Sequence, residues 1–231
     1  MALICTDMKK NLTLYFTCIL FLFTFSSCRQ DGPAPIRNVK AGPKLLRAQA
    51  GSSFTNYSYI SNHKQKSLGS VYTKQVLVAF ASGLSAEQEQ AILSQYGFVK
   101  EAAAEQVAMS SGQMHRVVLG DGLNPGQVEV ALQELAGDPQ ITYAAPFFLN
   151  GDKLLGLTNE ALVTVEAGGK ELLQELAKQF NAEVLPSNSS NLYIVKLDKN
   201  SQGDALAFVN YLQGKKGIVQ AEPDFVVSLN R

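Results

Sequence analysis

Apolar residues between positions 71 and 231 occur in short runs and in helical stripes, and the same order of runs and stripes occurs twice. Two strand-like runs, Val76–Phe80 and Ala161–Val165, begin the two stretches. Each run is followed by an amphipathic segment, two further strand-like runs, a second amphipathic segment and a final strand-like run. This order predicts a β-α-β-β-α-β arrangement in each stretch.

Helix-start and helix-stop signals are specific in the first stretch. Ser85 with Gln88 three residues later forms a capping-box pattern and predicts a helix start. Asn124-Pro125 predicts a second start, because proline at the first helical position loses no hydrogen bond, and Gly137 predicts its end. The strands expected around these helices are 98–108, 113–119 and 141–148.

The second stretch repeats the pattern more compactly. A stripe of Leu172, Leu173, Leu176 and Phe180 predicts its first helix. Ser201 with Asp204 predicts the start of its second helix. The remaining expected strands are 183–185, 192–197 and 218–227.

The two stretches align as copies of one unit. Residues 75–80 match 160–165, and residues 141–146 match 218–223. The order of elements is the ferredoxin-like pattern, in which two helices cover one face of a four-stranded antiparallel sheet. The sequence therefore predicts an α+β fold of two tandem ferredoxin-like units, residues 71–150 and 151–231. The uncovered sheet faces are expected to meet solvent, the neighbouring copy or a partner.

The N-terminus has the pattern of a targeting segment. Lys9 and Lys10 precede an apolar run from Leu12 to Phe25, which is too short to span a bilayer as a helix but suits the core of a secretory signal. Ser26-Ser27-Cys28 then resembles the lipobox of bacterial lipoproteins, although that family usually has leucine where this chain has Phe25.

This resemblance implies that residues 1–28 are a lipoprotein signal peptide and that Cys28 becomes the lipidated first residue. The protein would then be exported across the inner membrane and held by its lipid in the bacterial cell envelope, on the periplasmic or outer-membrane side. An ordinary signal peptide ending near a cysteine is the alternative.

Residues 29–70 are rich in glycine, proline and serine and sustain no helical or strand period, so they are expected to form a flexible linker. Seven basic residues against Asp31 give this segment a net charge of +6. Such a charge could hold it against an anionic membrane surface. A solvated spacer is the simpler interpretation, and we favour it.

Composition narrows the classes of function. The formal net charge is zero, 46% of residues are hydrophobic and 17% are charged, which excludes a disordered polyelectrolyte. Without long runs of basic residues, nucleic-acid binding is not expected. The zero charge conceals an uneven distribution, because residues 71–231 carry 11 basic and 18 acidic residues, a net charge of −7.

Catalytic motifs do not stand out. No Gly-x-Ser-x-Gly elbow, His-Glu-x-x-His motif or Walker-type loop occurs, and the two histidines, His63 and His115, are placed in the linker and in a strand. Beyond Cys28 the chain has no cysteine, which excludes disulfides and thiolate metal sites there. We therefore expect no enzymatic activity, no cofactor and no metal.

The end of the second copy carries a family resemblance. Ala221-Glu222-Pro223-Asp224-Phe225, after a βαββα unit, resembles the end of the propeptide of subtilisin-like serine proteases. The tandem arrangement resembles the fervidolysin-like N-terminal prodomain of large secreted subtilases. The resemblance covers about residues 72–228 and rests more on the order of elements than on the short motifs.

In that family the pro-region packs its sheet on the protease, assists its folding and leaves its C-terminal tail in the substrate cleft. The resemblance thus implies partner binding through the open sheet face and through Glu222, Asp224, Phe225, Val226, Val227 and Arg231. Carboxylates at the sheet edge could cap helix N-termini of the partner, and an extended tail, Val226–Arg231, could add a strand. Alternatively, Glu222 and Asp224 only solvate a strand end.

The first copy has Ala145 and Phe147 where the second has Glu222 and Asp224, so the second copy is predicted to be the active one. No His-Gly-Thr or Gly-Thr-Ser motif of a subtilase catalytic domain follows. The sequence therefore favours a membrane-tethered, propeptide-like inhibitor or folding assistant of a subtilisin-like protease. A truncated pro-region and a non-inhibitory cell-envelope binding or structural module are the alternatives.

Overall fold

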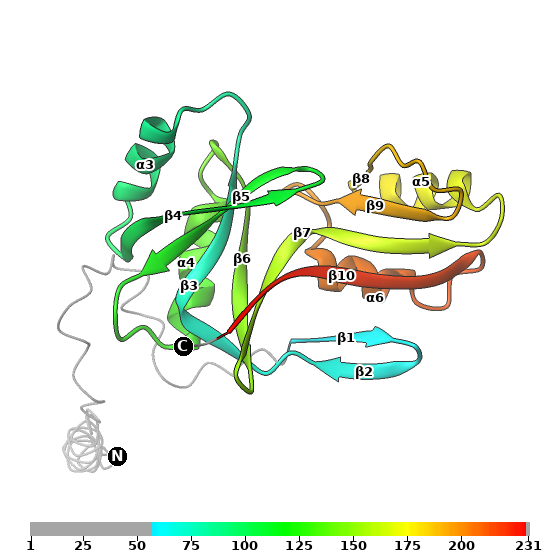
Figure 1. The fold of residues 1–231 in the computed structure, drawn as a ribbon, viewed down its shortest axis with the longest axis horizontal. Helices are drawn as coiled ribbons and strands as arrows, with labels where there is room; N and C mark the ends of the chain where they lie inside the picture. Colours follow the sequence, from blue (N-terminus) through cyan, green and yellow to red (C-terminus); the bar gives the residue numbers. More distant parts are fainter. Residues whose placement is uncertain (1–56, 230–231) are drawn as a thin grey trace, which may run out of the picture. The chain divides into compact units, whose positions relative to one another are not determined.

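The computed structural model describes residues 57–229, which form one eight-stranded sheet, a separate two-stranded hairpin and four helices (Figure 1). Six strands and helices make up the first unit: β3 (Ser70–Phe80), α3 (Ala86–Ser94), β4 (Val99–Met109), β5 (Gly112–Leu119), α4 (Pro125–Ala136) and β6 (Ile141–Asn150). The second unit contains β7 (Lys153–Val165), α5 (Lys170–Gln179), β8 (Glu183–Val184), β9 (Leu192–Lys196), α6 (Ala205–Leu212) and β10 (Ile218–Leu229).

The strand order is the same in both units. The first unit has the order β4-β5-β3-β6 and the second has β8-β9-β7-β10, with every pair antiparallel. This is the ferredoxin-like arrangement, so the predicted α+β fold of two tandem units is confirmed. The end of β6 also pairs with the start of β7, from Phe147 with Gly156 to Asn150 with Lys153, and this pairing joins the two sheets into one.

The two units agree in register, residue by residue. Val78 pairs with Ala144 in the first unit, and their sequence counterparts Val163 and Ala221 pair in the second. In both units the ladder shifts by one residue near its end, so that Thr142 and Val219 are the bulged residues. The alignment of 75–80 with 160–165 and of 141–146 with 218–223 therefore describes equivalent backbone positions.

Helix caps follow the sequence signals in the first unit. Ser85 and Asn124 are the N-caps of α3 and α4, each in a complete capping box, and Gly137 is the C-cap of α4. The start of α6 differs from the expectation, because Asp204 is the N-cap and accepts from the Ala207 N–H at 2.9 Å. Ser201 instead closes the preceding turn by accepting from the Asp198 N–H at 3.1 Å.

The predicted linker is wrong for its last part. Residues 58–67, expected to be flexible, form the hairpin β1 (Ser58–Ser61) and β2 (Lys64–Ser67). Its turn residues Asn62 and His63 both have positive φ, the conformation of a tight hairpin turn. The hairpin packs beside α6, where Asn210 Oδ1 accepts from the Ile60 N–H at 3.0 Å and Gln213 Nε2 donates to the Ile60 carbonyl at 2.9 Å. These contacts are remote in sequence, and the strands are too short and polar to show a period.

Candidate functional site

The second unit exposes apolar side chains on one face of its sheet. Leu162, near the end of β7, pairs with Ile194 of β9 on one side and with Glu222 of β10 on the other, so the three side chains share a face. Leu162 is 37% exposed and Leu192, two residues from Ile194 on the same face, is 44% exposed. We call Leu162, Leu192, Ile194 and Glu222 the exposed face of the second unit.

The opposite face of this sheet is fully covered. α5 and α6 lie on one side of the second unit's strands (Figure 1). The alternating residues of β7, β9 and β10 that face the helices are all buried, namely Ala161, Val163, Val165, Tyr193, Val195 and Ala221. Leu162 and Leu192 therefore lie on the side of β7 and β9 that none of the described helices covers.

The first unit closes its equivalent face. Leu77 matches Leu162 and pairs with Arg116 and Ala145, yet Leu77 is fully buried. Phe147 is also fully buried, and the Arg116 guanidinium lies 5.4 Å from the centre of its ring. A Cβ on Gly156 would come within 2.8 Å of both Phe147 and Leu77, so the start of β7 packs tightly on this face.

Glu222 is held by the hairpin. Its Oε1 accepts from the Ser61 hydroxyl at 2.7 Å and lies 3.7 Å from Lys66 Nζ. The Ser61 hydrogen bond is the main cause that lowers the pKa of Glu222 below its ordinary value, with a smaller contribution from Lys66. The carboxylate expected to cap a helix of a partner is thus already bound within the chain.

Asp224 and Phe225 also have partners inside the protein. The Thr158 hydroxyl donates to the Asp224 carbonyl at 3.1 Å and lies 3.4 Å from its carboxylate. The ring of Phe225 lies 6.0 Å from that of Tyr59 in the hairpin. Both residues therefore contribute to the attachment of β10, whatever further role they have.

The segment expected to be a free tail is in large part a strand. Val226 pairs with Gly156 and Val227 with Leu155, and β10 continues to Leu229. Val227 is 60% exposed, and the only described strand that pairs with β10 is β7, so the other backbone edge of β10 has no strand partner within residues 57–229. The predicted sites Cys28 and Arg231 lie outside the described residues.

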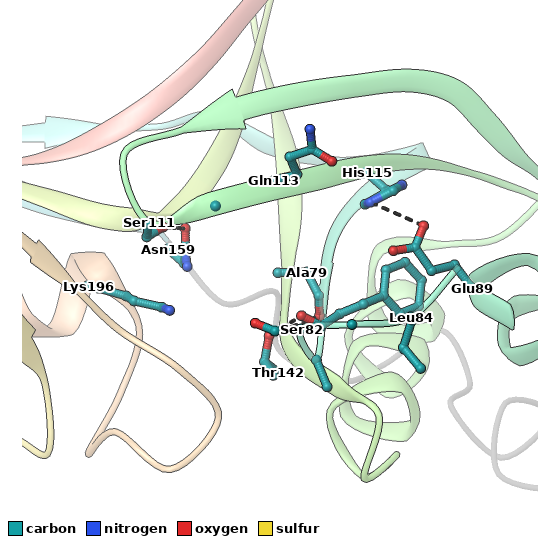
Figure 2. Close-up of a pocket in the computed structure, with 14 residues that line it drawn as sticks. Ala79, Ser82, Leu84, Glu89, Ser111, Gln113, His115, Thr142, Asn159 and Lys196 are labelled. Carbon is teal, nitrogen blue, oxygen red and sulfur yellow. Dashed lines mark hydrogen bonds and ion pairs between the residues drawn. The ribbon is translucent and has the colours of Figure 1, made fainter. Parts of the chain in front are cut away.

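A polar cavity that the sequence did not indicate lies where the two units meet. It has a volume of about 270 Å³, and Figure 2 shows its lining: the β3–α3 loop and Glu89, the β4–β5 turn and His115, Thr142 of β6, Asn159 of β7 and Lys196 of β9. These residues come from segments far apart in the chain and form no motif, so no sequence signal could have assembled them.

Hydrogen bonds across the cavity wall tie the units together. The Ser111 N–H donates to the buried Glu160 carboxylate at 2.5 Å, and the Ser111 hydroxyl donates to Asn159 Oδ1 at 3.2 Å. His115, expected on a strand surface or partly packed, is buried; its Nε2 lies 3.4 Å from Glu89 Oε2 and its ring meets the edge of Phe80 at 5.1 Å. The cavity is therefore bordered by an ordered polar framework.

Residues 57–229 contain neither a cluster of metal ligands nor a membrane-spanning helix. No group of three or more histidine, cysteine, aspartate or glutamate side chains in residues 57–229 is arranged to hold a metal ion. Within the same residues, no helix combines the length and the apolar character needed to cross a bilayer.

Comparisons with known proteins give little guidance. No family model matches the chain, and no curated protein matches it. The small subunit of acetolactate synthase from Thermotoga maritima is a distant structural neighbour, with 15% sequence identity, a TM-score of 0.29, and coverage of 68% of this chain and 96% of that one. A similarity of this size supports no inference about function, and the fold class stands on the strand order and register described above.

Proposed function

We propose that this protein is a lipid-anchored binding protein whose second unit docks a subtilisin-like serine protease in trans, inhibiting it or assisting its folding. The observation that carries the proposal is the difference between the two sheet faces. Leu77 is buried in the first unit, whereas its counterpart Leu162 is exposed beside Ile194 in the second. A face left open in one copy and closed in the other is suited to a partner.

The chemistry of the exposed face favours a protein partner. Leu162, Leu192 and Ile194 form an apolar centre with Glu222 at its rim, the usual composition of a protein interface. Beyond Phe225, against which Tyr59 of the hairpin packs, the edge of β10 around the exposed Val227 has no strand partner within residues 57–229 and offers backbone groups to an extended segment of the partner. Strand addition at this edge takes the place of the free tail expected from the sequence.

The anchor belongs to the same proposal. The lipobox-like segment ending at Cys28 would tether the protein in the cell envelope, and residues 29–56 would serve as a solvated spacer between the membrane and the folded part. Two other functions remain as outcomes of the test: a non-inhibitory envelope module, and the pro-region of a subtilase whose catalytic domain has been lost.

The proposal is tested by peptidase inhibition with the full chain in detergent against a panel of subtilases. Leu162→Asp is expected to weaken inhibition at least about tenfold, because it places a charge in the apolar centre. Ile60→Asp is the matched control, since Ile60 is 38% exposed but lies in the hairpin. Absence of binding to every subtilase, or equal inhibition by both variants, would contradict the proposal. Binding without inhibition or accelerated refolding would favour the non-inhibitory module.

A further inference from the structure

The cavity between the units has opposite charges at its two sides. Figure 2 shows Lys196 on one side and Glu89, paired with His115, on the other. Lys196 is half-buried and makes no ion pair or hydrogen bond among the described residues. Its ammonium group is therefore a cation directed into a semi-enclosed space without a partner of its own.

The neighbours of Lys196 do not neutralise it. Glu160 and Glu183 are its cross-strand partners on β7 and β8, but neither carboxylate forms an ion pair with it within residues 57–229. Glu160 instead accepts the Ser111 N–H, and Glu183 is exposed. Lys196 remains available to an anionic group in the cavity.

A second donor lies on the same side. The oxygen of the Asn159 amide is engaged by Ser111, and its nitrogen is turned toward the side where Lys196 lies (Figure 2). No described residue accepts a hydrogen bond from this nitrogen. An ammonium and an amide N–H₂ together match the two oxygens of one carboxylate.

The side of the cavity opposite Lys196, where Glu89 lies, is suited to a cationic group of the ligand. Only one oxygen of Glu89 contacts His115, so the other can accept from a ligand, and no lysine or arginine in the described residues pairs with Glu89. Between the two sides, Ala79, Phe80 and Leu84 add apolar wall. The volume of about 270 Å³ is at the lower end of ligand sites, which selects a small molecule.

We propose that this cavity binds a small zwitterion of the ω-amino acid type, with its carboxylate at Lys196 and Asn159, its ammonium group at Glu89 and the aliphatic chain between them along the apolar wall. Because the wall includes the first unit's β4–β5 turn and the second unit's β7 and β9, the bound molecule would contact both units. This inference is independent of the protease partner, since the cavity is lined by none of the exposed-face residues.

Calorimetric titration of the full chain in detergent with ω-amino acids of increasing chain length, from β-alanine to 6-aminohexanoate, tests the proposal. At least one is expected to bind, and its carboxamide and its N-acetyl derivative are expected to bind about tenfold or more weakly, because each lacks one of the two charges. Lys196→Met and Glu89→Gln are expected to weaken binding to a similar extent. Lys153→Met and Glu101→Gln, which change exposed strand residues outside the cavity, serve as controls.

Three results would overturn the proposal: no ω-amino acid binds, the neutral derivatives bind as well as the parent compound, or the cavity variants bind as well as the controls. Where a cavity variant loses its cooperative thermal transition, Lys196→Arg and Glu89→Asp replace it, and chemical-shift changes of the Asn159 side-chain amide report on the wild-type site. An ω-amino acid that binds without shifting this amide would also contradict the assignment.

Discussion

Leu77 and Leu162 occupy equivalent positions in the two units, but Leu77 is fully buried whereas Leu162 is 37% exposed. Each lies in the second half of the first strand of its unit and pairs with a neighbouring strand on both sides. The surroundings differ: Leu77 lies near Phe147 and the start of β7, and Leu162 lies between Ile194 and Glu222 at the surface. This face of the sheet is therefore part of the interior in the first unit and is open to solvent in the second.

This difference predicts unequal effects of the same substitution. Leu77→Ala is expected to lower the free energy of unfolding by about 2–5 kcal/mol, because it leaves a cavity in a packed core. Leu162→Ala should lower it by less than about 1 kcal/mol, because that side chain is partly in water already. Urea unfolding followed by circular dichroism measures both values, and equal effects would contradict the assignment of the two faces.

Gly156 is predicted to be sensitive to the smallest added side chain. A Cβ there would come within 2.6 Å of the Phe147 ring and 2.8 Å of Leu77, so Gly156→Ala should cost about 1–3 kcal/mol of stability. Phe147→Leu removes the ring, and the double variant should lose less than the sum of the two single losses. A double-mutant cycle in urea measures this coupling, and strictly additive losses would argue against the contact.

The hairpin should make stability depend on pH in the acid range. The folded-state pKa of Glu222 lies below its ordinary value of 4.5, so its contribution is complete above that pH and is lost as the pH falls through the folded-state value. Ser61→Ala removes the main cause and is expected to raise the pKa toward 4.5. An NMR titration of the Glu222 side-chain carboxyl measures the change, and Ser58→Ala in the same hairpin is the control.

An opposite dependence is expected in alkali. Burial, followed by the hydrogen bond to Asp138 at 2.9 Å, raises the pKa of Tyr96 from 10.0 to about 12. Because the folded form holds the proton more tightly, this contribution is present below pH 10 and is lost as the pH rises toward 12. Tyr96→Phe should reduce the loss of stability between these values, as measured by urea unfolding at several alkaline pH values. If the free energy of unfolding fell equally steeply with pH in Tyr96→Phe and in the wild type, the assigned role of Tyr96 would be contradicted.

The tandem repeat of two ferredoxin-like units could be predicted because its signals depend on residues that are close in the sequence. Capping boxes at Ser85 and Asn124 and the alignment of two strand pairs depend on neighbouring residues, and the structure reproduces both. The predicted start of α6 is wrong because serine and aspartate are both good N-caps, and only the path of the preceding turn decides between Ser201 and Asp204.

The parts that could not be predicted depend on contacts between distant residues. The hairpin at 58–67 is short and polar, and it is held in part by the hydrogen bond from the Ile60 N–H to Asn210 Oδ1, two residues that are 150 positions apart. Residues 77 and 162 are both leucine, so the residue type could not show that this face of the sheet is buried in the first unit and exposed in the second. The cavity combines side chains of both units, among them Lys196 and Glu89, that share no spacing or motif.

The bond between Ser61 and Glu222 joins residues that are 161 positions apart. Along the chain the hairpin precedes α6 and β10, the helix and the strand that hold it, so it is synthesised before both of its partners. Loop closure over such a distance is slow compared with the local pairing of β4 with β5 or of β6 with β7. We therefore expect the hairpin to reach its native position only after α6 and β10 have formed, so that its docking would depend on the last strand of the second unit.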